Sequence, residues 1–136
     1  DLLPAENEPF VEIYIANLEE GTVEMAFDEA TNDTDFSQPR WTPDGTWLAT
    51  ALRPVNTSIP KALWILPLDD GAPINVADEP SATYSAYQWD PWGELLVYQR
   101  FVLSGSVPNI TIWRWDWETQ EAVQILDNGA RPEWLP

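Results

Sequence analysis

Carboxylates are the most abundant side chains in this sequence that could carry out chemistry. The chain of 136 residues has 23 Asp and Glu against 6 Lys and Arg, with no His and no Cys, and its net charge is −17. Two carboxylates hydrolyse glycosides when the fold holds them at a fixed separation. No local pattern singles out such a pair, so we expect no catalytic residues.

The residue types exclude several other chemistries. Without His and Cys the chain has no His-based triad, no thiolate nucleophile and no Cys-ligated metal site. Residues 103–106 lack the Gly-x-Ser-x-Gly pattern of a hydrolase nucleophile. The acidic balance argues against nucleic acid, because phosphates bind clustered Lys and Arg. No apolar run approaches the length of a membrane span, so we expect no membrane insertion.

An acidic stretch at residues 28–35 has the oxygen ligands that calcium prefers. It lacks the turn glycine and the distal glutamate of an EF-hand loop, which favours a solvated loop. We expect no metal site and no cofactor, although the sequence alone leaves calcium binding at this stretch open.

Nine tryptophans suggest a second chemistry, because aromatic rings can stack on sugars. Most of them recur at fixed positions of an internal repeat, which favours a role in the core. Trp92 is the exception, since it lies in a turn where the repeat requires no tryptophan.

Two motifs repeat along the chain with nearly the same period. Trp-x-Pro-x-Gly-x-x-Leu starts at Trp41 and again at Trp89, 48 residues later, and a third copy starts at Trp134. An apolar segment followed by a turn recurs at intervals of 50 and 49 residues, around Tyr14, Trp64 and Trp113. Periods of this length indicate a repeat architecture.

Turn residues divide each period into strands. Pro43 presets φ and Gly45 accepts a positive φ, so residues 43–45 predict a turn between a short strand ending near Thr42 and a strand over 47–52. A second hairpin is expected at residues 68–71. Each period therefore holds four strands, and these are apolar on both faces, as in sheets that stack on one another.

These residues resemble the TolB-like β-propeller repeat. Pro-x-Trp-Thr-Pro-Asp-Gly-x-x-Leu-Ala, from Pro39, and Leu-Trp-Ile-x-x-Leu-x-x-Gly, from Leu63, are similar to that family's Trp-Ser-Pro-Asp-Gly-x-x-Leu-Ala-Phe and Ile-Tyr-Val-x-Asp-x-x-Gly. The resemblance implies an all-β propeller of about six blades, a periplasmic or extracellular location in bacteria, and a role in protein–protein contacts. Trp92 replaces the turn aspartate, so we expect the second turn to lack its side-chain cap.

The repeat divides the chain into parts of a single partial propeller. We expect the last two strands of one blade over 11–27, complete four-stranded blades over 39–77 and 87–126, and the first strand of another blade over 131–135. Propellers need at least about four blades to close. Either the chain is a fragment of a longer protein, or two copies close a ring of about six blades as a homodimer.

The predicted interaction surface combines aromatic and basic residues, which are favoured at protein interfaces. We expect residues 84–87 to form a loop before a first strand, with basic residues at the ends of second strands; the candidates are Arg53, Tyr84, Tyr87, Trp92 and Arg100. In the alternative interpretation Tyr87 packs under its blade and Arg100 pairs with a carboxylate.

The function expected from these features is a non-enzymatic propeller domain that serves as a protein–protein interaction scaffold in the bacterial cell envelope. The alternative is a propeller that binds a ligand or sugar, or gates access, beside a catalytic, peptidase-like domain outside this chain.

Overall fold

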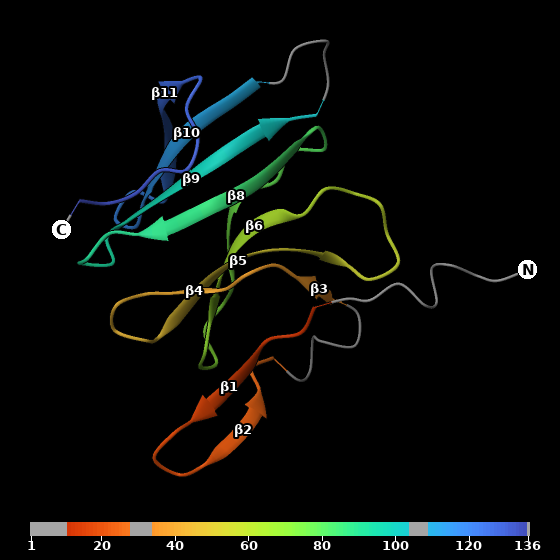
Figure 1. The fold of residues 1–136 in the computed structure, drawn as a ribbon, viewed down its shortest axis with the longest axis vertical. Helices are drawn as coiled ribbons and strands as arrows, with labels where there is room; N and C mark the ends of the chain where they lie inside the picture. Colours follow the sequence, from red (N-terminus) through yellow and green to blue (C-terminus); the bar gives the residue numbers. More distant parts are fainter. Residues whose placement is uncertain (1–10, 28–33, 104–108, 136) are drawn as a thin grey trace, which may run out of the picture.

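The computed structural model describes residues 11–27, 34–103 and 109–135. The regular structure of these residues is entirely β, in antiparallel sheets that follow one another in chain order (Figure 1). The expected all-β fold class is therefore confirmed. The described residues contain no helix long and apolar enough to cross a membrane.

The first sheet is a hairpin of β1 (Tyr14–Asn17) and β2 (Thr22–Met25). The side chain of Asn17 accepts hydrogen bonds from the backbone amides of Glu19 and Glu20, which holds the turn. Gly21 closes the turn at a φ of 68°.

The middle sheet contains β3 (Thr34–Phe36), β4 (Arg40–Trp41), β5 (Trp47–Pro54), β6 (Ala62–Pro67) and β7 (Ile74–Ala77). Both β3 and β4 pair with β5, so together they form one interrupted first strand. Pro39 lies in the interruption and has no N–H to donate to a ladder. The sheet thus begins at residue 34 rather than at residue 39.

The third sheet has the order β11-β10-β9-β8 and contains β8 (Ala82–Trp89), β9 (Leu95–Val102), β10 (Asn109–Asp116) and β11 (Glu121–Asp127). The expected loop at residues 84–87 is wrong, because these residues belong to β8. A register shift between Ser85 and Gln88, with Ala86 at a φ of 51°, adds a bulge and lets the strand continue.

Residues 131–135 form no strand, contrary to expectation, because their backbone pairs with none of the described strands. Trp134 is nevertheless anchored, because its indole Nε1 donates to the carbonyl of Gln88 at 3.2 Å.

The middle sheet is buried on both faces. Leu63 and Ile65 face the third sheet, in a cluster that also contains Tyr87, Trp89 and Trp115. On the other face a smaller cluster joins the middle sheet to the first hairpin through Ile13, Phe36, Leu48 and Leu66. This arrangement explains why both parities of these strands are apolar.

Candidate functional site

Four turns gather at one end of the middle and third sheets, here called the turn end. The turns at 42–46 and 90–94 project to the same side of the molecule (Figure 1). The hairpin turn at 68–73 contacts the turn at 42–46, because Leu68 N donates a hydrogen bond to Thr46 O at 3.1 Å. The turn at 117–120 contacts the turn at 90–94, because Trp117 N donates a hydrogen bond to Glu94 O at 2.9 Å.

Asp44 holds the turn at 42–46. Its Oδ1 accepts hydrogen bonds from the hydroxyl of Thr42 at 2.7 Å and from the amide and hydroxyl of Thr46 at 3.1 and 2.7 Å. The bonds from Thr42 and Thr46 lower the pKa of Asp44 below its usual value. The carboxylate is therefore charged at neutral pH.

The turn at 90–94 keeps a side-chain cap, so the expectation that it lost one is wrong. Asp90 Oδ1 accepts from the amide of Glu94 at 2.8 Å, and Asp90 N donates to Leu95 O at 3.0 Å. In the repeat alignment, Asp90 corresponds to Thr42 and Trp92 corresponds to Asp44. The capping residue of the second turn therefore lies two positions earlier than that of the first turn. This shift releases position 92 from a structural role in the turn.

A cleft of about 470 Å³, here called the tryptophan cleft, lies between these two turns. Trp92 is 77% exposed at its rim. Trp47 and Trp117 form a wall, with ring centroids 5.1 Å apart and planes at 72°. Trp117 also contacts the rings of Trp89 and Trp115 in the core. The full lining is Thr42, Pro43, Asp44, Trp47, Trp92, Gly93 and Trp117.

A neighbouring hollow of about 480 Å³ lies across Pro43 from the cleft. Trp41 and Trp134 line it, together with the buried Trp89 and Asp90. Arg40 supplies its one basic side chain, so the two hollows differ in charge.

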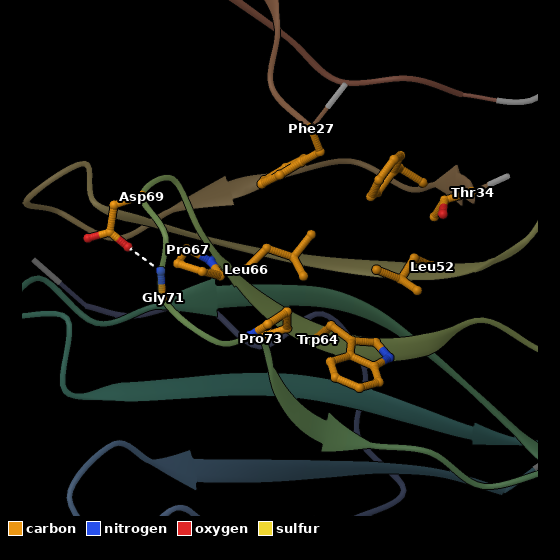
Figure 2. A pocket seen from close by; sticks show the side chains of 10 residues that line it. Phe27, Thr34, Leu52, Trp64, Leu66, Pro67, Asp69, Gly71 and Pro73 are labelled. Atoms are coloured by element: carbon orange, nitrogen blue, oxygen red, sulfur yellow. Dashed lines mark hydrogen bonds between the residues drawn. The ribbon is translucent and has the colours of Figure 1, made fainter. Parts of the chain in front are cut away.

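A third hollow, of about 380 Å³, lies between Phe27 and the middle sheet (Figure 2). Its walls are apolar, and Asp69 is the only titratable side chain among its lining residues: Phe27, Thr34, Phe36, Leu52, Trp64, Leu66, Pro67, Asp69, Gly71 and Pro73. The Oδ1 of Asp69 accepts a hydrogen bond from the amide of Gly71 at 2.8 Å. The chemistry of this hollow is that of a core.

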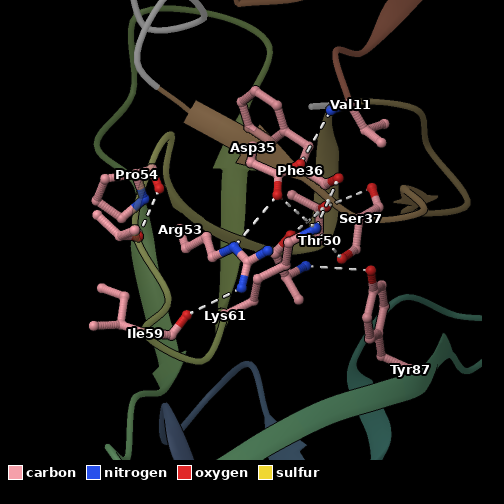
Figure 3. Close-up of polar contacts among 12 residues, drawn as sticks. Val11, Asp35, Phe36, Ser37, Thr50, Arg53, Pro54, Ile59, Lys61 and Tyr87 are labelled. Atoms are coloured by element: carbon pink, nitrogen blue, oxygen red, sulfur yellow. Dashed lines mark hydrogen bonds and ion pairs between the residues drawn. The ribbon is translucent and has the colours of Figure 1, made fainter. Parts of the chain in front are cut away.

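Arg53, expected at an interaction surface, belongs to an ion-pair cluster around Asp35 (Figure 3). Arg53 Nε and Lys61 Nζ lie 3.3 and 3.4 Å from Asp35 Oδ2, and Val11 N donates to Oδ1 at 3.0 Å. Burial acts to raise the pKa of Asp35, but the Val11 bond and the charges of Lys61 and Arg53 outweigh it and lower that pKa.

Tyr84 and Arg100 meet at Glu79, in the connection between the middle and third sheets. Arg100 donates to both oxygens of Glu79, and the Tyr84 hydroxyl donates to the same carboxylate at 2.9 Å. The Arg100 bonds lower the pKa of Glu79, while burial and then Glu79 raise the pKa of Tyr84. Tyr84 is only 5% exposed, so these groups fasten a connection rather than form an open surface.

Tyr87 is also buried, and its hydroxyl links the two large sheets. It donates to Gln38 O and accepts from Ala51 N, which lies 3.2 Å away. The structure therefore does not bring the five candidate residues together, and only Trp92 lies at the turn end.

Sequence reasoning missed Trp47 and Trp117 as partners of Trp92 and Asp35 as the partner of Arg53. The alternative interpretation included a carboxylate partner for Arg100, which the structure identifies as Glu79. The location of Arg53 and Arg100 near the ends of equivalent second strands was the available signal for the ion pairs. Within the described residues, no three Asp or Glu side chains gather closely enough to hold a metal ion.

Comparison with known proteins supports the fold. No protein-family model and no curated protein sequence matches this chain. A solved structure named "Oligogalacturonate lyase in complex with manganese" matches with a TM-score of 0.64 and 19% identity, over 88% of this chain. This chain spans 31% of the length of that protein.

The expectation that this protein is not an enzyme is contradicted by that comparison, because the solved structure it resembles is that of an enzyme. At 19% identity the likeness establishes the fold, and residue roles do not transfer with it. The chain folds as part of a β-propeller.

Proposed function

We propose that this β-propeller chain binds a protein partner at its turn end, with the tryptophan cleft as the contact surface. Trp92 carries the proposal, because it is 77% exposed on a turn whose capping is done by Asp90. Exposed tryptophans beside fixed aromatic walls are typical anchors of protein interfaces. On the resemblance to TolB-like repeats, we place this role in a bacterial cell envelope, either periplasmic or extracellular.

Selection of displayed peptides against the 136-residue chain tests the proposal. We expect the selected peptides to bind Trp92→Ala at least tenfold more weakly, since anchor residues carry most of the binding energy. Leu18→Ala is the matched control, because Leu18 is 92% exposed on the turn of the first hairpin, outside the cleft. Peptides that bind Trp92→Ala as tightly as the unaltered chain would contradict the proposal.

A second candidate is a neutral sugar in the same cleft, supported by the three indole rings that line it. A polyuronate of the kind named for the lyase carries its own carboxylates, which a chain of net charge −17 repels. Titration with neutral oligosaccharides tests this candidate, and binding that Trp92→Ala leaves unchanged would argue against it.

A further inference from the structure

We infer that the tryptophan cleft recognises a cationic side chain, an arginine or lysine of a basic partner segment, between Trp92 and the wall formed by Trp47 and Trp117. This inference rests on the proposed docking at the turn end and adds the chemical group that is recognised there. The aromatic geometry and the charge of the turn end support it independently.

The aromatic geometry suits a cation. Trp92 is open to solvent, and Trp47 and Trp117 meet edge to face with centroids 5.1 Å apart. A cation over an indole ring is attracted by the negative face of the ring. The chain already contains one such contact, in which the guanidinium of Arg100 lies 5.9 Å from the centroid of Trp113.

The charge of the turn end points the same way. Its four turns contain no Lys or Arg and six carboxylates: Asp44, Asp69, Asp70, Asp90, Glu94 and Glu118. Asp44 lines the cleft itself. Its three hydrogen bonds from Thr42 and Thr46 all end on Oδ1, and no other described side chain donates to Oδ2. That oxygen can accept from an incoming guanidinium or ammonium group.

The position of the tryptophan cleft favours it as a binding site over the apolar hollow beside Phe27. Its walls come from the middle and third sheets, whose strands all lie within the described residues. The hollow beside Phe27 is bounded opposite the middle sheet by Phe27 alone among the residues before β3. Among the described residues, the lining of the cleft therefore comes from two sheets that pack against each other.

The test uses two defined peptides and the whole chain. Ac-Gly-Arg-Gly-Arg-Gly-amide is compared by calorimetry with the same peptide carrying citrulline, the uncharged analogue of arginine. We expect the arginine peptide to bind at least fivefold more tightly. Trp92→Leu should weaken it about tenfold, whereas Trp92→Phe, which keeps an aromatic face, should retain most of the affinity.

Asp44→Asn separates the charge of Asp44 from its role in the turn, because the amide oxygen still accepts from Thr42 and Thr46. Asp69→Asn is the matched control, since Asp69 caps a neighbouring turn through the amide of Gly71 and lies outside the cleft. We expect Asp44→Asn to weaken arginine binding about threefold and Asp69→Asn to leave it unchanged. Equal losses in both variants would overturn the inference, because they would assign binding to overall charge.

Three further outcomes test this inference together with the docking proposal. Equal binding of the arginine and citrulline peptides, with both weakened by Trp92→Leu, would overturn cation recognition and leave docking in place. Binding of neither peptide, together with Trp92-dependent binding of neutral xylohexaose, would overturn it in favour of a sugar. Peptide binding that Trp92→Leu does not alter would overturn both proposals.

Discussion

Trp89 and Trp134 make the same contact one repeat apart. Trp89 Nε1 donates to the carbonyl of Arg40 at 3.1 Å, and Trp134 Nε1 donates to the carbonyl of Gln88 at 3.2 Å. Each acceptor immediately precedes the motif tryptophan of the previous repeat. The motif therefore encodes a link between consecutive repeats, and the link forms at Trp134 although the residues around it make no strand.

Replacing either tryptophan with phenylalanine should remove this link and keep an aromatic ring. We expect Trp89→Phe to lower the free energy of unfolding by about 2 kcal/mol, because it leaves the Arg40 carbonyl without its donor in a packed site. Trp134→Phe should cost less than about 1 kcal/mol, since Trp134 is only half-buried. Urea denaturation measures both, and equal costs would contradict the assignment of Trp134 to a peripheral site.

The ion-pair cluster around Asp35 should make stability depend on pH. The folded state lowers the pKa of Asp35 below its usual 3.8, so its contribution is complete at neutral pH. This contribution is lost as the pH falls below about 3.8 and through the folded-state value. We expect Asp35→Asn to lower the free energy of unfolding by about 2 kcal/mol at pH 7.

The difference in the free energy of unfolding between the unaltered chain and Asp35→Asn should shrink when urea denaturation is repeated in acid. Asp70→Asn, at an exposed hairpin position, removes one charge without breaking this cluster and serves as the control. A difference that stays constant down to pH 2 would show that Asp35 contributes through shape rather than charge.

The period of the repeat predicted the fold class well, because turns and apolar strands are determined by residues that are close together in the sequence. Pro43 and Gly45 mark a turn in the sequence, and the structure places a turn there. The bulge at Ala86 was not predictable, since alanine has no intrinsic preference for a φ of 51°. Likewise Gln120 takes a φ of 55° where the earlier copies have glycine.

The candidate site was predictable only at Trp92, where the tryptophan breaks the repeat. Its partners Trp47 and Trp117 come from different sheets, and sequence spacing does not show which turns meet across a sheet boundary. The carboxylate partners of the two arginines could not be identified from the sequence for the same reason. Arg100 is held by Glu79, 21 residues away in the connection between sheets, and only the folded chain brings the two together.

The salt bridge between Glu79 and Arg100 should contribute a modest coupling free energy to the stability of the fold. Their two hydrogen bonds are bidentate, yet the side chain of Glu79 is 46% exposed and therefore well screened by water. We expect a double-mutant cycle of Glu79→Gln and Arg100→Gln to give about 1 kcal/mol, falling by at least half in about 1 M NaCl. A coupling that does not respond to salt would indicate packing against Trp113 instead.

Among the described residues, no strand pairs with one edge of β1 in the first hairpin, and the register shows which residues face that edge. Ala26 N donates to Ile13 O at 2.8 Å, so Ile13, Ile15 and Asn17 direct their main-chain groups toward β2. Tyr14 and Ala16 direct theirs to the opposite edge, where no described strand pairs with β1. The equivalent strands β6 and β10 are paired on both sides.

Because an unpaired edge recruits another strand, we expect β1 to pair with a second copy of the chain, giving a dimer mass in light scattering that falls on dilution. Ala16→Pro should shift the chain to monomer by removing an amide from the open edge. Val23→Pro is the matched control, because Val23 lies directly opposite Ala16, is 68% exposed, and directs its amide to the outer edge of β2. The dimer should survive that change. A chain that is monomeric at every concentration, or that dissociates equally in both variants, would show that this edge does not recruit a second copy.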